Sequence, residues 1–369
     1  MMLQKILRKR SLIFLLFSFV LSFFLAIATQ YPQPVIAQGK ATPVSEGKAI
    51  DPERSLILGM HIENIYNLSL KDKNFSAEGW FWLEWPEAVQ QLIVKNKIPL
   101  LELVEMVNQV EAWDSQIQLD SPEPELKPNG NRLQLYRFSA KFYDDSQTLK
   151  RFPFQQLELP IIIETRPTVF SLASEAIRLN PALESKGVKG QYAGLNGYQA
   201  GDVSVKKLIY TYNTNFGEHN GIEGGEFSRV EYNINYYTEF WSAFYQYVMP
   251  WLAVMAMLVL APNLEGKFTE MRLAIPSTAL LTLVFLQLGT NADLPKLSYV
   301  SFLDQLYIFG YIASIILFAL FVWGSNAYGN AIESQREIVM RKINNIDVIY
   351  QSIVIGGSIF IAVAAFGFR

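Results

Sequence analysis

The sequence predicts a multi-domain β + α membrane protein, in which an extracellular or periplasmic β-sandwich is followed by a four-helix transmembrane bundle. Three observations support this fold class. Residues 1–37 have the pattern of an export signal, residues 38–241 are polar with alternating strand-like segments, and residues 242–369 contain four long apolar runs. A length of 369 residues also fits two domains better than one.

The amino terminus has the parts of a secretory signal peptide. Four basic residues lie within residues 5–10, and residues 11–27 form an apolar core. Small residues allow cleavage after Ala28 or after Ala37, so the signal peptide extends at most to residue 37. The alternative is an uncleaved anchor helix. In either case the chain that follows is exported.

Residues 38–241 contain segments with the periodicity of strands. In residues 136–142 and 230–236, large apolar side chains alternate with polar ones, which predicts strands with one buried face. The apolar members are Tyr136, Phe138, Ala140 and Phe142 in the first segment and Val230, Tyr232, Ile234 and Tyr236 in the second. Several such strands, separated by turn signals, favour a sandwich. We expect residues 213–226 to form a loop between two strands and residues 173–187 to include a short helix.

Four apolar runs follow, at about residues 244–262, 271–290, 302–323 and 347–368. Each is close to the roughly 20 residues that a helix needs to cross the hydrocarbon core of a bilayer. With the sandwich outside, the first and third connections are cytoplasmic. They hold Lys267, Arg336, Arg341 and Lys342, whereas the outer connection, residues 291–301, holds only Lys296. This distribution follows the positive-inside rule and places both mature termini outside.

The second apolar run carries polar residues on one stripe of the predicted helix. Ionisable and polar residues at membrane depth usually face a bundle interior or water. If several copies of the helix surround one axis, the stripe becomes the wall of a pore. A ring of Glu270 carboxylates would then favour cations, and the apolar outer end would gate by dewetting. The stripe consists of Glu270, Ala274, Thr278, Leu281, Phe285 and Leu288, at spacings of three and four.

A purely structural explanation of the same residues stays open. The helix dipole stabilises a carboxylate such as Glu270 at a helix N-terminus without any role in conduction. Ser277 and Thr278 can bond to neighbouring helices. Their hydroxyls can also satisfy the backbone carbonyl that Pro276 frees.

Composition excludes several kinds of chemistry. The chain has no cysteine, which excludes disulfides, thiolate metal sites and thiol nucleophiles. The chain has only two histidines, His61 and His219, which is too few for the usual zinc clusters and makes most histidine-based catalysis unexpected. The net charge of −3 gives no reason to expect a nucleic-acid partner. Without a phosphate-binding loop, a nucleophile elbow or a metal motif, we expect neither an enzyme nor a cofactor, and we assign no metal ligands.

Five groups of short motifs are spread over almost all of the mature chain. They are Gly59-Met60-His61-Ile62-Glu63-Asn64-Ile65-Tyr66 with Trp85, Arg137-Phe138-Ser139-Ala140 followed by Arg151-Phe152-Pro153-Phe154, Pro250, Leu294-Pro295-Lys296 with Tyr299, and Phe366-Gly367-Phe368. In their order, their spacing and their agreement with the number of spans, the chain resembles pentameric ligand-gated ion channels. The resemblance is to the bacterial branch that lacks the Cys-loop disulfide.

The resemblance implies a homopentamer with heterologous contacts, whose second transmembrane helix lines the pore. It places an agonist site between neighbouring sandwiches, beneath the loop at 213–226. It also implies that residues of two connections couple the agonist site to the pore. These are Phe152, Pro153 and Phe154 in one connection and Lys296 and Tyr299 in the other. A ligand shifts such a gate only through its different affinities for the open and closed states.

The chain departs from the family pattern at five positions. Lys97 stands just before the Ile98-Pro99 pair, where the family often has a tryptophan. Gln155 stands where the family usually has an aspartate, and Thr238 stands where an arginine commonly precedes the first span. Both departures change the usual ionic coupling. Ala274 replaces a polar ring near the cytoplasmic mouth, and Phe285 is bulky for its pore position. These two departures predict a narrow or poorly conducting pore.

The candidate ligand-binding residues lie in the 213–226 loop and just before it. They are Tyr210, Tyr212, Phe216, Glu218, His219 and Glu223. Aromatic rings with carboxylates can hold a cationic amine. His219 among carboxylates can instead titrate near neutral pH, and the same carboxylates can hold calcium. A solvated loop without a specific role is the remaining interpretation.

We therefore expect a pentameric ligand-gated ion channel that prefers cations, in the bacterial cytoplasmic (inner) membrane with its sandwich in the periplasm. Its partners would be further copies of itself, a small-molecule, proton or cation ligand, permeant inorganic ions and membrane lipids. The alternative is a non-conducting membrane-anchored binding or sensor protein of the same architecture.

Overall fold

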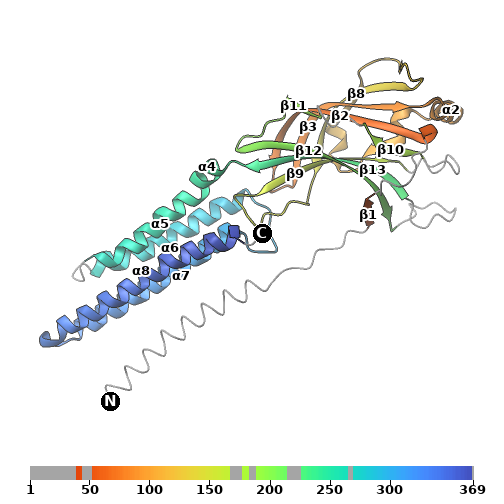
Figure 1. Ribbon diagram of the computed structural model, residues 1–369. Helices are drawn as coiled ribbons and strands as arrows, with labels where there is room; N and C mark the ends of the chain where they lie inside the picture. Colours follow the sequence, from red (N-terminus) through yellow and green to blue (C-terminus); the bar gives the residue numbers. More distant parts are fainter. Residues whose placement is uncertain are drawn as a thin grey trace. The chain divides into compact units, whose positions relative to one another are not determined.

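The computed structural model describes residues 39–43, 52–166, 177–182, 188–213, 226–264 and 269–367. The expected signal peptide, residues 1–37, lies outside this set. The chain divides into two compact units. The strand unit holds residues 34–147 and 156–239, and the helix unit holds residues 240–369 together with the short segment 148–155 (Figure 1).

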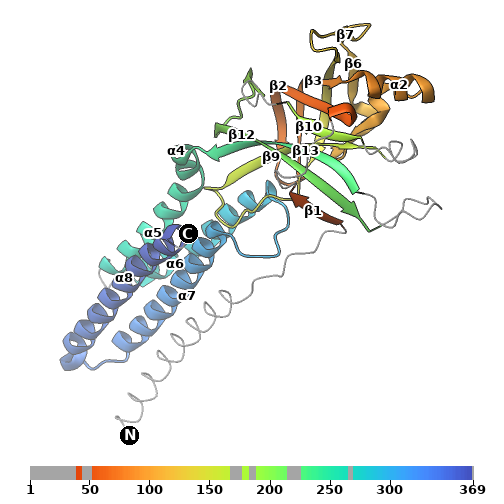
Figure 2. The same cartoon turned by 45° about the vertical axis from the view of Figure 1, so that its right-hand side comes forward.

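Two sheets form the strand unit (Figures 1 and 2). The five-stranded sheet has the order β1-β12-β13-β9-β4, with β1 at Gly39–Pro43, β4 at Val104–Met106, β9 at Gln156–Thr165, β12 at Tyr198–Tyr212 and β13 at Glu226–Thr238. The eight-stranded sheet has the order β10-β2-β3-β8-β5, with β11 on β2 and with β6 and β7 on β8. Its strands are β2 Ser55–Ser69, β3 Asn74–Trp85, β5 Gln109–Val110, β6 Gln116–Leu119, β7 Glu125–Leu126, β8 Arg132–Tyr143, β10 Arg178–Pro181 and β11 Lys189–Tyr192. Helix α2, Glu87–Asn96, follows β3.

The core of the strand unit is built from the predicted alternation. All four apolar residues of 136–142, on β8, and all four of 230–236, on β13, are buried in one cluster with residues of β2, β3 and β9. The Tyr232 hydroxyl donates to the Leu58 carbonyl at 2.7 Å, and that of Tyr236 donates to the Ala193 carbonyl at 2.6 Å. Burial raises the pKa of both tyrosines, so they remain hydrogen-bond donors. The strand prediction for these two segments is confirmed.

Residues 177–182, the described part of the segment 173–187 in which a short helix is expected, contain no helix; the rest of the segment lies outside the described residues. Residues 177–182 instead include β10, which pairs in parallel with β2. Leu179 is buried in the core, and its backbone N–H donates to the Ser228 hydroxyl at 2.9 Å. Pairing with β2 and burial of Leu179 therefore prevail over the local helical propensity of the segment.

Among the described residues, four helices are long and apolar enough to cross a membrane, as predicted. The first span, Phe240–Asn263, contains α4 Phe240–Ala243, a π-helical turn at Phe244–Val248, and α5 Met249–Leu260. The others are α6 Thr269–Ala292, α7 Phe302–Gly329 and α8 Arg336–Gly367. Helices α5, α6, α7 and α8 run side by side in both views (Figures 1 and 2). The chain is thus a β domain followed by a four-helix bundle of the multi-pass membrane type.

The last helix begins well before its apolar run. Helix α8 starts at Arg336, whereas hydropathy marks a start near residue 347. In this first part Ile343 is buried, while Arg341, Lys342 and Asn344 are exposed. An amphipathic extension of this kind packs against the bundle with one face only, so its mean hydropathy is too low to mark it.

Helices α5, α6 and α7 approach closely at Gly310. A Cβ at this position would lie 2.8 Å from Cδ1 of Leu283 on α6 and 3.2 Å from Nε1 of Trp251 on α5. Trp251 Nε1 donates to the Leu306 carbonyl at 2.8 Å, one turn before Gly310. A glycine is therefore the residue that allows these three helices to pack at this distance.

Candidate functional site

Helix α6 has one face packed in its own bundle and one face exposed. Arg272, Pro276, Ala279 and Leu283 are buried. The predicted pore stripe lies on the other face, and all of its residues are exposed: Glu270, Ala274, Thr278, Leu281, Phe285 and Leu288. Phe285 is 64% exposed, so the described part of the chain leaves this large ring uncovered.

The exposed face of α6 differs in chemistry from that of α8. The large exposed side chains of α8 from residue 348 onward are apolar: Val348, Ile349, Ile353, Ile355, Ile359, Phe360 and Val363. That surface suits lipid tails. The exposed face of α6 mixes Glu270, Ser277 and Thr278 with large apolar residues. Only 17% of the apolar part of α6 is buried, compared with 22–39% in the other three spans. Helix α6 is thus the span that its own bundle covers least.

Other polar residues of α6 face neighbouring helices. Gln287 Nε2 lies 3.4 Å from Asp304 Oδ1 on α7, and the Tyr311 hydroxyl donates to Gln287 Oε1. The Thr290 hydroxyl lies 3.4 Å from the Tyr307 hydroxyl. The polar groups of α6 therefore separate by face, because one set bonds to α7 and the set that includes Glu270 and Thr278 is exposed.

Arg272 lies on the buried face of α6 and pairs with α8. Its Nη2 atom is 2.7 Å from Oδ2 of Asp347, and each side chain is 9% exposed. The guanidinium carbon also lies 4.3 Å from the ring centroid of Phe321 on α7. One arginine therefore joins α6, α7 and α8 near the amino-terminal end of α6.

The predicted coupling residues Phe152 and Phe154 lie against the helices, within the helix unit. Their segment, 148–155, connects β8 and β9. Phe152 is 4% exposed and meets Tyr247 edge-on with a centroid separation of 5.0 Å. Phe154 stacks on Phe240 at 5.1 Å and lies 6.2 Å from Phe302. The peptide bond between Phe152 and Pro153 is cis.

Backbone hydrogen bonds add to these ring contacts. The Leu149 N–H donates to the Tyr299 hydroxyl at 2.8 Å, and the Phe302 N–H donates to the Lys150 carbonyl at 2.8 Å. Tyr299 thus lies together with the segment that holds Phe152 and Phe154. Lys296 is exposed and forms no ion pair with another described residue.

The described ligand candidates, Tyr210 and Tyr212, belong to a charged cluster on the five-stranded sheet. Arg229 Nη2 lies 2.7 Å from Glu164 Oε2, with side chains 9% and 1% exposed. The Tyr212 hydroxyl donates to Glu164 Oε1 at 3.0 Å. The Arg229 guanidinium lies 3.8 Å from the Tyr210 ring centroid, so the cation of the chain itself occupies one face of that ring.

Strand register explains this cluster. Arg229 on β13 pairs with Glu164 on β9 and with Leu208 on β12, and Tyr210 is two residues further along the same face of β12. Val230 and Ile163, the neighbours of the ion pair in sequence, point into the core instead. Glu164 and Arg229 are therefore buried on the opposite face of the sheet, at the end where β12 and β13 lead into the 213–226 loop.

Burial is the largest influence on Glu164 and raises its pKa above the usual 4.5, while Arg229 acts in the opposite direction. Burial likewise raises the pKa of Tyr212. The folded state binds the Glu164 proton more tightly than the unfolded chain does. Protonation of Glu164 therefore contributes to the stability of the folded state at low pH. This contribution is lost as pH rises through the folded-state pKa.

Glu164→Gln tests this sign, because glutamine resembles the neutral carboxyl at every pH. Relative to wild type, the melting temperature of the variant is expected to rise as pH increases from about 4 to about 7. Thermal unfolding of the full chain in detergent measures the difference. Glu158→Gln, which changes an exposed carboxylate on the same strand, corrects for the general effect of one lost charge. The opposite slope would mean that attraction to Arg229 exceeds the cost of burial.

The sequence did not point to Glu164, Arg229 or Asp347, because each depends on a partner far away in the chain. The remaining ligand candidates, Phe216, Glu218, His219 and Glu223, lie outside the described residues. No protein-family model matches the chain, and no curated protein matches it.

Proposed function

We propose that this chain is one subunit of a homopentameric ligand-gated ion channel, of the bacterial branch without the Cys-loop disulfide. In this proposal α6 lines a pore that prefers cations, and the strand unit lies in the periplasm above the cytoplasmic membrane. The agonist, a small amine, a proton or another cation, binds between neighbouring sandwiches near Tyr210, Tyr212 and the 213–226 loop.

The exposed, mixed face of α6 carries the proposal. A face with Glu270 and Thr278 among large apolar residues suits neither lipid tails nor the bundle of one chain. Around a shared axis the same face meets water. Leu281, Phe285 and Leu288 then form an apolar constriction, and Glu270 forms a ring of carboxylates.

The contacts of residues 148–155 support the gated form of this proposal. The segment leaves the sandwich at β8 and returns to it at β9, yet its aromatic rings lie against Tyr247, Phe240 and Phe302 of the helices. A displacement of the segment would therefore act directly on the bundle. Such a connection is what a ligand-driven gate needs, since the ligand must favour one arrangement of the helices over another.

Cysteine accessibility tests the pore face, and the absence of native cysteine removes any background labelling. Thr278→Cys and Ile353→Cys both place a thiol on a surface that is exposed in the single chain. In reconstituted vesicles, a charged thiol reagent added in water is expected to label the first and not the second, because the reactive thiolate forms only where water reaches. Leu283→Cys, at a buried position, serves as the unlabelled control.

Chemical cross-linking of the same vesicles measures subunit number, and a ladder that ends at five chains is expected. Equal labelling of Thr278→Cys and Ile353→Cys would contradict a water-lined α6. A ladder that ends at one chain would leave the non-conducting sensor as the function that fits the architecture.

A further inference from the structure

Two consecutive lysines of β12 have different surroundings. Lys206 is exposed and lies opposite Glu231 of β13 in the strand register. Lys207 is partly buried and lies opposite Val230, a residue of the core. Because residues directly opposite each other share a face of the sheet, Lys207 is on the core-facing side of β12. One ammonium group is therefore next to a carboxylate at the surface, and the other is directed toward the second sheet.

A neutral amide of the second sheet binds the Lys207 side chain. Its Nζ atom donates to Asn180 Oδ1 on β10, and Asn180 Nδ2 donates to the Ser55 hydroxyl on β2. Asn180 and Ser55 are each 7% exposed, so this amide is held in place with its oxygen toward the lysine. Arg178 lies two residues before Asn180 on β10 and therefore on the same face of that strand, and its positive charge acts on Lys207.

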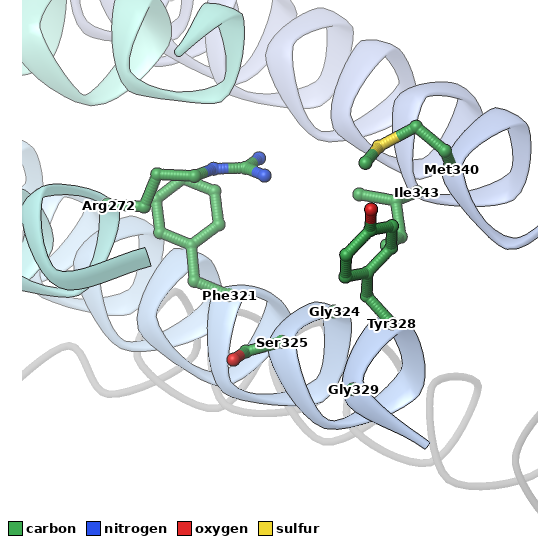
Figure 3. A pocket seen from close by; sticks show the side chains of 8 residues that line it. All are labelled: Arg272, Phe321, Gly324, Ser325, Tyr328, Gly329, Met340 and Ile343. Atoms are coloured by element: carbon green, nitrogen blue, oxygen red, sulfur yellow. The ribbon is translucent and has the colours of Figure 1, made fainter. Parts of the chain in front are cut away.

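The buried arginines of the described residues have carboxylate partners. Arg229 and Arg272 each lie 2.7 Å from a carboxylate oxygen, and Figure 3 shows Arg272 over the ring of Phe321. No carboxylate among the described residues pairs with Lys207 in this way. Burial, and after it the charge of Arg178, lowers the pKa of Lys207. The neutral amine is therefore easier to form here than in a lysine surrounded by water.

We propose that Lys207 is a modification site, which reacts with carbon dioxide and carries a carbamate. The lone pair of the neutral Nζ atom attacks the carbon of CO₂ and forms the N–C bond, while one C=O electron pair moves onto oxygen. One proton leaves the nitrogen for water, so the products are a carbamate anion and a released proton. The nitrogen keeps one N–H, which still donates to Asn180 Oδ1.

The change of charge favours this product at Lys207. Before the reaction two cations, Lys207 and Arg178, repel each other, and after it Arg178 is close to an anion. An aldehyde would form an imine without negative charge and would not gain this attraction. At Lys206 the carbamate would instead be an anion opposite Glu231, which is unfavourable. The inference does not depend on whether α6 lines a pore.

The test uses full-length protein in detergent, equilibrated at mildly alkaline pH with ¹³C-bicarbonate as the source of CO₂. Triethyloxonium then transfers an ethyl group to the carbamate oxygen and makes the product stable. Mass spectrometry with peptide fragmentation locates the ¹³C-labelled ethyl carbamate, which we expect on Lys207 and not on Lys206. Absence of the label from Lys207, or equal labelling of the two lysines, overturns the proposal.

Three variants complete the experiment, with the ¹³C NMR signal of the intact protein as a second measurement. Lys207→Arg keeps a positive charge but has no amine to react, so it should lose both the label and the carbamate signal, whereas Lys206→Arg should leave both unchanged. Arg178→Gln removes the cation that favours the product and should weaken the label. If Arg178→Gln does not fold, wild type and the two lysine variants still decide. The proposal is overturned by a signal that persists in Lys207→Arg, by a label in folded Arg178→Gln as strong as in wild type, or by a signal without ethyl carbamate, which would indicate bicarbonate bound without a covalent bond.

Discussion

Asp347→Ala is expected to destabilise the helix bundle by about 3–5 kcal/mol, the usual cost of removing one partner from a buried ion pair. The variant leaves the guanidinium of Arg272 between three helices, 9% exposed and without its carboxylate. A guanidinium cannot lose its proton to escape this situation. Arg272→Ala should cost less, because a carboxyl left alone can bind a proton and become neutral. Chemical unfolding of the full chain in detergent measures both values.

The chain supplies a matched control on α8. Arg341 and Glu337 form a pair at 2.8 Å, nearly the same distance as in the buried pair, but both side chains are 79% exposed. Water screens this pair, and exposed helix pairs four residues apart contribute only about 0.3–0.5 kcal/mol. Glu337→Ala should therefore have almost no effect. Similar losses for Asp347→Ala and Glu337→Ala would show that burial does not determine the importance of the first pair.

Phe285→Ala is expected to convert a protein with little or no basal current into one that conducts without ligand. In the proposed pentamer, five Phe285 rings narrow the pore between Leu281 and Leu288, and an apolar constriction of this kind excludes water and ions. Removing the rings widens and wets it. Currents through purified protein in planar bilayers measure the effect, with Leu280→Ala, one position off the stripe, as the control.

Two results would count against this interpretation. Absence of current in Phe285→Ala under every condition of pH and small amines would favour the non-conducting sensor. Equal currents in Leu280→Ala would indicate a leak through a damaged bundle. The conducting variant also allows selectivity to be measured, since adding Glu270→Gln should move the reversal potential in a salt gradient toward zero. An unchanged reversal potential would remove Glu270 as the selectivity filter.

Local periodicity was enough to predict the main strands and the spans. Residues 136–142 and 230–236 show their buried face in the order of the residues alone, and the spacing of the α6 stripe places its residues on one face, which is exposed in the single chain. The strand β10 was not predicted, because it depends on an edge of β2 that precedes it by more than 100 residues. The first turns of α8 were missed for a related reason, since one apolar face among charged residues does not raise mean hydropathy.

The partners within the candidate sites were beyond the reach of sequence patterns. Arg272 and Asp347 are 75 positions apart, and Asp347 stands at the first residue of the fourth apolar run, where no local pattern marks it as the partner of an arginine on α6. Glu164 and Arg229 are separated by 65 positions and become neighbours only through the register of β9 and β13. Both ion pairs form only when the strands pair and the helices pack, so no local pattern reveals them.

Gly310 restricts how the bundle can rearrange. Because a methyl group here would lie 2.8 Å from Cδ1 of Leu283, a closer approach of α6 to α7 at this point requires the Leu283 side chain to move. The amino-terminal end of α7 is tied to Lys150 by a backbone hydrogen bond, so a pull on that connection would reach α6 by way of the glycine contact.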